Sequence, residues 1–313
     1  MSSLPTKRDI AAGLLGRAGL IGALAPAAPG ALRILAYHRI LDQSDAHLPF
    51  LFDDGVISAS TASFRSQMDY VARNFDVISF SDLCDIEGSG GAWPRRPLIV
   101  TFDDGYRDNY TEAFPVLKEL GIPATVFVTT AHMGSNSLFW WDLVAFCFKT
   151  TERTGIILDE IAVEELDLRT LAGRQSAVGR VLRWMKTVPD GVRTRFIEKL
   201  PNALGVVLTT DQAIGMHLSW DEIREMADWG IEFGSHTVSH PVLSRVDDEQ
   251  VEREVRDSKA ALERELNREA IVFSYPVGGR GNFDSRATAG FSVCAELYPL
   301  VFSARGTLPV WQC

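Results

Sequence analysis

Short apolar runs alternate with amphipathic stretches through most of the chain. Apolar, β-branched runs of about four to eight residues, bounded by glycine, proline or aspartate, are typical of buried strands. Stretches with apolar residues three and four positions apart are typical of helices that cover a sheet. These patterns predict strands near residues 31–40, 75–80, 98–102, 124–130, 231–235 and 271–275, and helices around 64–71, 109–120, 219–228 and 247–268.

A strand, a helix and a strand follow one another between residues 98 and 130, which is the spacing of a βαβ unit with parallel strands. This alternation predicts an α/β fold, and 313 residues are within the size of one α/β barrel. The pattern changes between about 135 and 215, where successive segments look helical. We therefore expect a leader or helix at 1–30 and one domain over 31–313, with a helical insertion at about 135–215.

The first 30 residues fit two kinds of segment. Lys7 and Arg8 precede an apolar stretch that ends in small residues, as in a signal peptide. Arg17 interrupts that stretch, whose apolar residues also share one helical face, so an amphipathic leader helix fits as well. The weak signal favours a cytoplasmic location over a periplasmic or secreted one. No run of about 18 apolar residues is free of charges, so we expect no membrane span.

Charge and cysteine spacing narrow the classes of partner. A net charge of −10 argues against nucleic acid and anionic membranes as partners, and leaves neutral sugars, peptides and small cations open. The four cysteines are far apart and form no CxxC pair, which argues against a cysteine-ligated zinc site. The sequence leaves the oligomeric state open.

Two adjacent carboxylates follow the strand at 98–102. Gly105 lets the chain turn, so that Asp103 and Asp104, which would point to opposite faces of a continued strand, can reach one pocket. One would then bind a metal ion and the other would act as a base. By itself Asp-Asp-Gly is an ordinary turn sequence. A second copy, at residues 53–55, is set aside because no clear strand precedes it.

His236 and His240 follow the strand at 231–235, at the same end of the predicted sheet as the two aspartates. On a helical turn, side chains four positions apart lie on one face, about 5–6 Å apart at Cβ, so both imidazoles could bind one metal ion. An isolated pair of this kind is also common on protein surfaces. Two histidines and one carboxylate with open positions, however, form a known catalytic metal geometry.

Two strand ends add further candidates. Tyr275, Pro276 and Val277 end the strand at 271–275, and the backbone N–H groups after the proline are free of the sheet and could donate to an oxyanion. The alternative is a simple strand end. His38 ends the first strand, and taken alone it is interpreted as a packed core histidine.

Aromatic and basic residues near these motifs could contact a ligand. Trp140 and Trp141 could stack on a sugar ring, although packing in a core is their more usual role. Tyr106 and Arg107 directly follow the carboxylate motif, and we expect them to line a cleft.

Together these segments resemble the polysaccharide deacetylases, that is, carbohydrate esterase family 4 or the NodB-homology family. Residues 101–105, Thr-Phe-Asp-Asp-Gly, match the family's first motif, and residues 236–241 match its second, H-[ST]-x-x-H-P. Residues 275–278 are similar to a reduced third motif. The resemblance covers roughly residues 31–300.

The resemblance implies a distorted (β/α)7 barrel and separate roles for the motif residues. Asp103 would be the general base, while Asp104, His236 and His240 would bind a divalent metal ion. Zinc is the preferred metal, with Co2+, Ni2+ or Mn2+ as alternatives. The implied partner is an acetylated carbohydrate.

The sequence departs from the family pattern in two places. The third motif usually carries an arginine that tunes the base; here Ser274 and Tyr275 precede the proline, and Arg280 is the available substitute. The late motif with the acid histidine is missing, because no histidine follows His240. Residues 34–38, Ile-Leu-Ala-Tyr-His, look like that motif moved to the N-terminus, as in the circularly permuted branch that acts on exopolysaccharides. A barrel has no unique first strand, so His38 becomes the candidate general acid.

The expected activity is hydrolytic removal of N-acetyl groups from poly- or oligosaccharides that contain N-acetylglucosamine, such as chitooligosaccharides or exopolysaccharides. One alternative is an O-acetyl esterase or another C–N hydrolase on the same fold. A second is a carbohydrate-binding pseudoenzyme without activity, which the weak third motif suggests. The intact set Asp103, Asp104, His236 and His240 argues against the pseudoenzyme.

Overall fold

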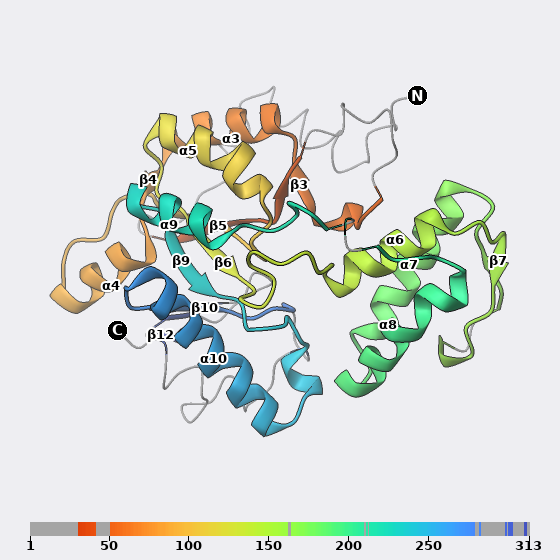
Figure 1. Ribbon diagram of the computed structural model, residues 1–313. Helices are drawn as coiled ribbons and strands as arrows, with labels where there is room; N and C mark the ends of the chain where they lie inside the picture. The colour runs from red at the N-terminus through yellow and green to blue at the C-terminus, as the bar shows by residue number, and fades with distance from the viewer. Residues whose placement is uncertain are drawn as a thin grey trace.

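The computed structural model describes residues 31–41, 51–161, 164–209, 211, 213–278, 282, 298, 300–302 and 310–311. The expected leader at 1–30 and Arg280 lie outside these residues. Strands and helices alternate along the described chain, largely in the order that the hydrophobic pattern predicts (Figure 1).

A mostly parallel sheet forms the centre of the structure. Its strands are β1 (Arg33–Tyr37), β4 (Asp76–Val77), β5 (Pro97–Phe102), β6 (Thr125–Val128), β9 (Glu232–Ser235), β10 (Val272–Ser274), β11 (Leu300–Phe302) and β12 (Val310–Trp311). They pair in the order β1, β5, β6, β9, β10, β11, β12, and β4 joins β5 beside this path. All of these pairs are parallel except β11 with β12. The α/β prediction is therefore confirmed; among the described strands the barrel is an open half-barrel.

Alternate residues of the central strands face two different cores, as the pleat of a strand requires. On β5, Leu98 and Val100 belong to the larger core, whereas Ile99 belongs to a smaller one. The larger core is covered by α3 (Thr61–Asn74), α5 (Phe114–Leu120), α9 (Trp220–Trp229) and α10 (Asp248–Leu266). The smaller core is closed by α4 (Phe80–Ser89). Burial on both faces explains why these strands are continuously apolar in sequence.

Serine caps set the start of two of these helices. Ser219 caps α9 and Ser79 caps α4, and in each case the residue three positions later, Glu222 or Asp82, bonds back to the cap. The Ser219 cap confirms the predicted helix start. The strand predicted at 75–80 is wrong in extent, because only two residues, one of them the cap Ser79, separate the end of β4 from the start of α4. The helix predicted at 109–120 opens with a wide π-turn over residues 109–113 before α5.

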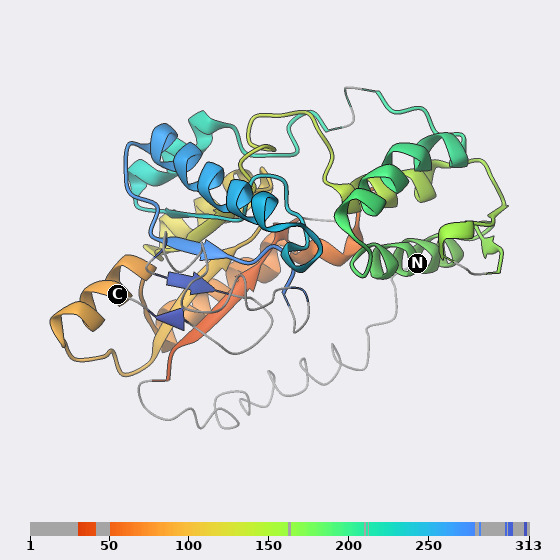
Figure 2. The same cartoon turned by 90° about the horizontal axis from the view of Figure 1, so that it is seen from below.

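Three helices lie in the range predicted as a helical insertion. They are α6 (Trp140–Thr150), α7 (Leu171–Met185) and α8 (Asp190–Leu204), with a short antiparallel pair of strands, β7 (Gly155–Ile156) and β8 (Leu166–Asp167), between α6 and α7. The three helices form a bundle to one side of the sheet, in both views (Figures 1 and 2). Their core includes Tyr106, which directly follows the turn after β5, so the bundle is joined to the carboxyl end of the sheet.

The described helices do not include one that is both long enough and apolar enough to cross a membrane.

Gly234 on β9 tests how tightly the sheet is packed on the side of the smaller core. A Cβ added there would lie 2.6 Å from the ring of Phe127 and 2.8 Å from Cγ1 of Val272, both of which belong to the smaller core. We expect Gly234→Ala to lower the free energy of unfolding by about 1–3 kcal/mol, because these core side chains must move. Gly88→Ala on α4 is the control, since a Cβ there meets nothing within 4 Å. Denaturant unfolding of both variants checks this, and equal stabilities would contradict it.

Candidate metal centre and active site

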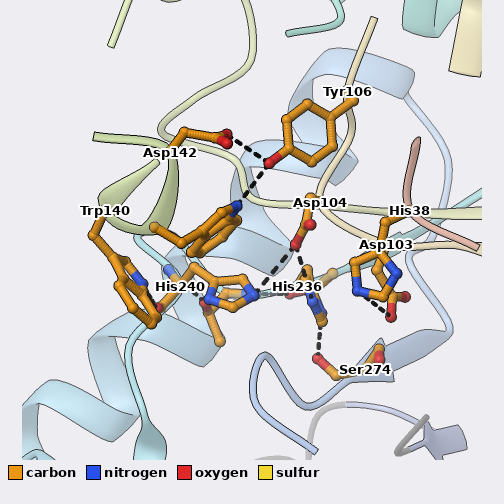
Figure 3. A network of polar contacts seen from close by, with 12 residues as sticks. His38, Asp103, Asp104, Tyr106, Trp140, Asp142, His236, His240 and Ser274 are labelled. Atoms are coloured by element: carbon orange, nitrogen blue, oxygen red, sulfur yellow. Dashed lines mark hydrogen bonds and ion pairs between the residues drawn. The ribbon is translucent and has the colours of Figure 1, made fainter. Parts of the chain in front are cut away.

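The carboxyl ends of four strands of the central sheet bring the motif residues together (Figure 3). His38 follows β1, Asp103 and Asp104 follow β5, His236 follows β9, and Ser274 ends β10. They meet beside a cavity of about 160 Å³. The predicted site residues that line this cavity are His38, Asp103, Asp104, Trp140, Trp141, His240, Tyr275, Pro276 and Val277.

Asp104, His236 and His240 form a buried cluster, the metal group, with the spacing of metal ligands. Oδ1 of Asp104 lies 3.3 Å from Nε2 of His240 and 3.6 Å from Nε2 of His236. Tetrahedral bonds of about 2.0–2.1 Å to one Zn2+ would put ligand atoms about 3.3–3.4 Å apart. Oδ1 of Asp104 is buried and has no hydrogen-bond partner among the described residues. The donor set therefore fits a divalent cation.

The second nitrogen of His236 fixes the direction of its ring. Nδ1 lies 2.9 Å from the backbone oxygen of Ser274, so Nδ1 carries the proton and donates to that carbonyl. The lone pair of Nε2 is thereby left facing Asp104, as in other metal sites in which a carbonyl orients a ligand. Burial lowers the pKa of His236 to about 3, which keeps the ring neutral and able to bind a metal ion.

The backbone between the two histidines is an irregular loop, so the predicted helical turn is wrong. Thr237 and His240 have φ of 70° and 58°, and Asp104 has φ of 77°. Residues other than glycine adopt this left-handed backbone conformation at a cost of roughly 1–2 kcal/mol. Two of the three candidate ligands are thus held in unfavourable backbone conformations, which the surrounding contacts must stabilise.

Glu254 supplies much of that support, and sequence reasoning missed it. Its buried carboxylate, on α10, accepts hydrogen bonds of 2.8 Å from the backbone N–H groups of both Val238 and Ser239, and another from the Ser239 hydroxyl. The only sequence signal was a glutamate at a position of the helix where apolar neighbours, Val251 and Val255, indicate burial. The nearby Trp140 adds a 3.3 Å bond from its indole N–H to the carbonyl of His240.

Asp103 and His38 face each other beside the metal group. Nε2 of His38 lies 4.0 Å from Oδ2 of Asp103, and the buried Oδ1 of Asp103 has no hydrogen-bond partner among the described residues. The pKa of Asp103 is raised to about 7. Burial is the main cause of this rise, which His38 opposes and the neighbouring Asp104 carboxylate supports. The His38 backbone is held by Ser58 Oγ and by Asn109 Nδ2, at 2.9 and 2.8 Å.

Two predicted substrate contacts are corrected by the structure. Tyr106 is fully buried, and its hydroxyl donates to Asp142 at 2.7 Å while accepting the Trp141 indole N–H at 2.7 Å. Arg107 turns away from the cavity to pair with Glu222 at 2.7 Å. Neither residue lines the cavity, because Tyr106 packs into the core of the insertion and Arg107 is held by Glu222 on α9.

Comparison with known proteins agrees with this geometry. A family model for polysaccharide deacetylases matches residues 90–165 and 197–289, which is more than half of the chain and includes both motifs. The chain belongs to the polysaccharide deacetylase family. Among named relatives, YxkH of Bacillus subtilis, named as a polysaccharide deacetylase, is 22% identical over 80% of this chain and 58% of its own length. The poly-beta-1,6-N-acetyl-D-glucosamine N-deacetylase of Staphylococcus aureus is 36% identical over 28% of this chain and 30% of its own.

Solved structures of deacetylases share the fold. IcaB from Ammonifex degensii superposes with a TM-score of 0.51 at 20% identity, covering 89% of this chain and 85% of that one. A de-N-acetylase from Aggregatibacter actinomycetemcomitans gives a TM-score of 0.52 at 16% identity, covering 87% of both chains. At these identities the likeness concerns the fold of the family.

Glu254→Gln tests the support of the histidine loop. The amide keeps one acceptor oxygen but turns an N–H2 group toward backbone donors, so the loop should loosen. We expect zinc affinity, measured by competition with a chromogenic chelator, to fall about 10- to 100-fold, as for other residues that orient metal ligands. Glu252→Gln is the control, because Glu252 pairs with Arg256 on the exposed face of the same helix. Equal affinities in the two variants would refute the role given to Glu254.

Tyr106→Phe tests the buried network under the site. The change leaves the buried Asp142 carboxylate and the Trp141 N–H without a shared partner, so the free energy of unfolding should fall by about 1–3 kcal/mol. Tyr70→Phe, at a tyrosine that is 43% exposed, should change it little.

The loss of stability in the Tyr106→Phe variant should also depend on pH. Burial raises the pKa of Asp142 from 3.8 to about 7, and the Tyr106 hydrogen bond is one of the contacts that lower it. A carboxyl with a raised folded pKa binds its proton more tightly in the folded state, so its contribution to stability falls as pH rises from about 4 toward the folded pKa. Without Tyr106 that pKa rises further, and the deficit of the variant should be larger at pH 8 than at pH 5. Chemical unfolding at both values measures this.

Proposed function

We propose that this protein is a metal-dependent N-deacetylase of polysaccharides or oligosaccharides that contain N-acetylglucosamine. The observation that carries the proposal is the buried Asp104–His236–His240 group with Asp103 and His38 beside it. All of these residues except His236, which lies behind the wall, line one cavity. Membership of the polysaccharide deacetylase family supports it. So do the partial matches to proteins named poly-beta-1,6-N-acetyl-D-glucosamine N-deacetylases.

The metal proposed for this site is zinc, with Co2+, Ni2+ or Mn2+ as alternatives. Neutral imidazole nitrogen and carboxylate oxygen are ligands that zinc accepts, and three protein ligands leave a position open for catalysis. The bound ion would supply Lewis acidity and lower the pKa of a water molecule.

The remaining chemistry is assigned to groups of the chain itself. As the oxygen of a water molecule bonds to the acetamide carbonyl carbon, the Asp103 carboxylate takes the water's proton. The developing oxyanion accepts a hydrogen bond from the Val277 N–H in the loop after β10. His38 then donates a proton to the sugar nitrogen as the C–N bond breaks. The products are acetic acid, which ionises to acetate by losing a proton to solvent, and a free amino sugar. Asp103 then releases its proton to solvent and His38 takes one up, which restores both side chains and balances atoms and charge.

The cavity walls suit a sugar ring in this reaction. Trp140, Trp141, Tyr275 and Pro276 give the cavity an apolar part, while the carboxylates and histidines give it a polar part. Sugars present both kinds of surface, and binding sites of mixed lining orient such ligands. The tryptophans also pack on the site itself, since the Trp141 ring lies 4.5 Å from that of His240.

The decisive experiment is Asp103→Asn with metal content measured in the same samples. Acetate release from N-acetylglucosamine oligomers should fall about 100- to 10,000-fold, the usual contribution of a general base, while bound zinc per chain stays the same. Asp85→Asn, an exposed aspartate on α4, is the control.

Other outcomes select the alternatives. Full activity of Asp103→Asn would refute the base assignment. Acetate released from O-acetylated sugars but not from N-acetylated ones would make the protein an esterase. Tight sugar binding without acetate release from either substrate would make it a pseudoenzyme.

A further inference from the structure

One wall of the active-site cavity has no role in the chemistry above. It is formed by Asp53 and Val56, in the turn η2 (Asp54–Val56) and just before it, and by Leu182 and Lys186, at the carboxyl end of α7. Asp53 belongs to the second Asp-Asp-Gly sequence, which the sequence pattern alone gave no reason to connect with the site. The fold places both copies of this sequence on the same cavity.

A second cavity, of about 220 Å³, lies on the other side of this wall. Asp53 and Leu182 line both cavities and so stand between them. On α7 the residues that line the two cavities are Gln175, Val178, Gly179, Leu182 and Lys186. Spacings of three and four put these residues on one helical face, and eleven residues of helix extend over about 16 Å. The helical insertion thus presents a long face to the space that begins at the metal group.

The turn that carries Asp53 is firmly held. The Asp53 N–H donates to Oδ1 of Asp142 at 3.0 Å, and the Asp53 carboxylate accepts the Gly55 N–H at 2.9 Å. Lys149 pairs with Asp54 at 2.8 Å from a side chain that is 5% exposed. Because Asp142 also accepts the Tyr106 hydroxyl, hydrogen bonds tie this wall to Tyr106, which lies two residues after Asp104 in the chain.

The chemistry of the wall suits a carbohydrate. Asp53 offers a hydrogen-bond acceptor and Lys186 a donor, while Leu182 and Val178 offer apolar surface. Burial raises the pKa of Asp53, and the Gly55 N–H and the ammonium groups of Lys149 and Lys186 oppose that rise. Lys186 therefore acts electrostatically on the same carboxylate. A neighbouring donor and acceptor beside an apolar patch match the hydroxyl groups and the ring face of a second sugar.

We propose that Asp53 and Lys186 bind the sugar residue next to the one that reacts, and that the polymer continues along α7 over Leu182 toward Gln175. The inference rests on the proposed function. It gives the helical insertion a role in choosing the length of the substrate.

The test compares β-1,6-linked N-acetylglucosamine oligomers of one to four residues with a small aryl acetate, which has no second sugar. For the wild type, kcat/KM should rise from the monosaccharide to the trisaccharide. In Asp53→Asn and in Lys186→Met, KM for the trisaccharide should rise about tenfold or more with kcat changed less than about threefold, as when binding alone is lost. Aryl acetate hydrolysis should change much less than trisaccharide hydrolysis. Arg180→Met, an exposed cation on the same helix, is the control.

Unchanged length dependence in both variants, or an equal loss in Arg180→Met, overturns the inference. If the wild type cleaves the aryl acetate but releases no acetate from any oligomer, the proposed function fails instead. In that case calorimetry of trisaccharide binding tests the sugar site on this wall separately. Trisaccharide binding that Asp53→Asn weakens about tenfold supports the wall as a sugar site, and absence of binding to the wild type refutes it.

Discussion

The burial of the Asp104 carboxylate is the constraint on which the site depends. Its Oδ1 faces the Nε2 atoms of two histidines, with no hydrogen bond among the described residues to satisfy it. Although burial opposes ionisation, the nearby His240, His38 and His236 lower the pKa of Asp104, so it is charged at neutral pH. A buried charge is costly unless it is paired or coordinates a metal ion. Three converging ligand atoms make a cation the natural partner for this charge.

Much of the surrounding structure serves to hold these three atoms in place. The Ser274 carbonyl orients His236, the Glu254 carboxylate holds the loop before His240, and Trp140 bonds to the His240 carbonyl. These partners come from β10, α10 and α6, which lie far apart in the sequence. The left-handed backbone at Asp104 and His240 is tolerated because several contacts fix it at once.

The helical insertion is part of the candidate site rather than an addition to it. The guanidinium of Arg193 on α8 lies 5.2 Å from the centre of the Trp140 ring. The indole N–H of Trp140 in turn donates to the carbonyl of His240. Asp142 on α6 links Tyr106, under the site, to the turn at Asp53. Loosening of the bundle would therefore change the positions of both His240 and the cavity wall at Asp53, because closely packed side chains transmit strain between them.

The sequence alone predicted most strands of the central sheet, most of the helices and the residues of the candidate metal group. Continuous apolar runs on β5 and β6 reflect burial on both faces, which is a local property of the strand. The pairing of Asp-Asp-Gly with a histidine motif was specific enough to indicate a metal site and a family. His38 could be proposed as a partner because sheet neighbours, not chain order, decide which strand ends meet. β1 does lie beside β5.

Only the tertiary structure decided how these residues are held and which others join them. The histidine loop is not helical, because contacts from Glu254 and Thr237 replace the hydrogen bonds of a helix. Tyr106 is buried since the bundle packs over it, and Asp53 reaches the cavity because its turn bonds to Asp142. Each of these outcomes depends on groups more than ten residues apart, or on backbone conformations, that hydrophobic periodicity does not encode.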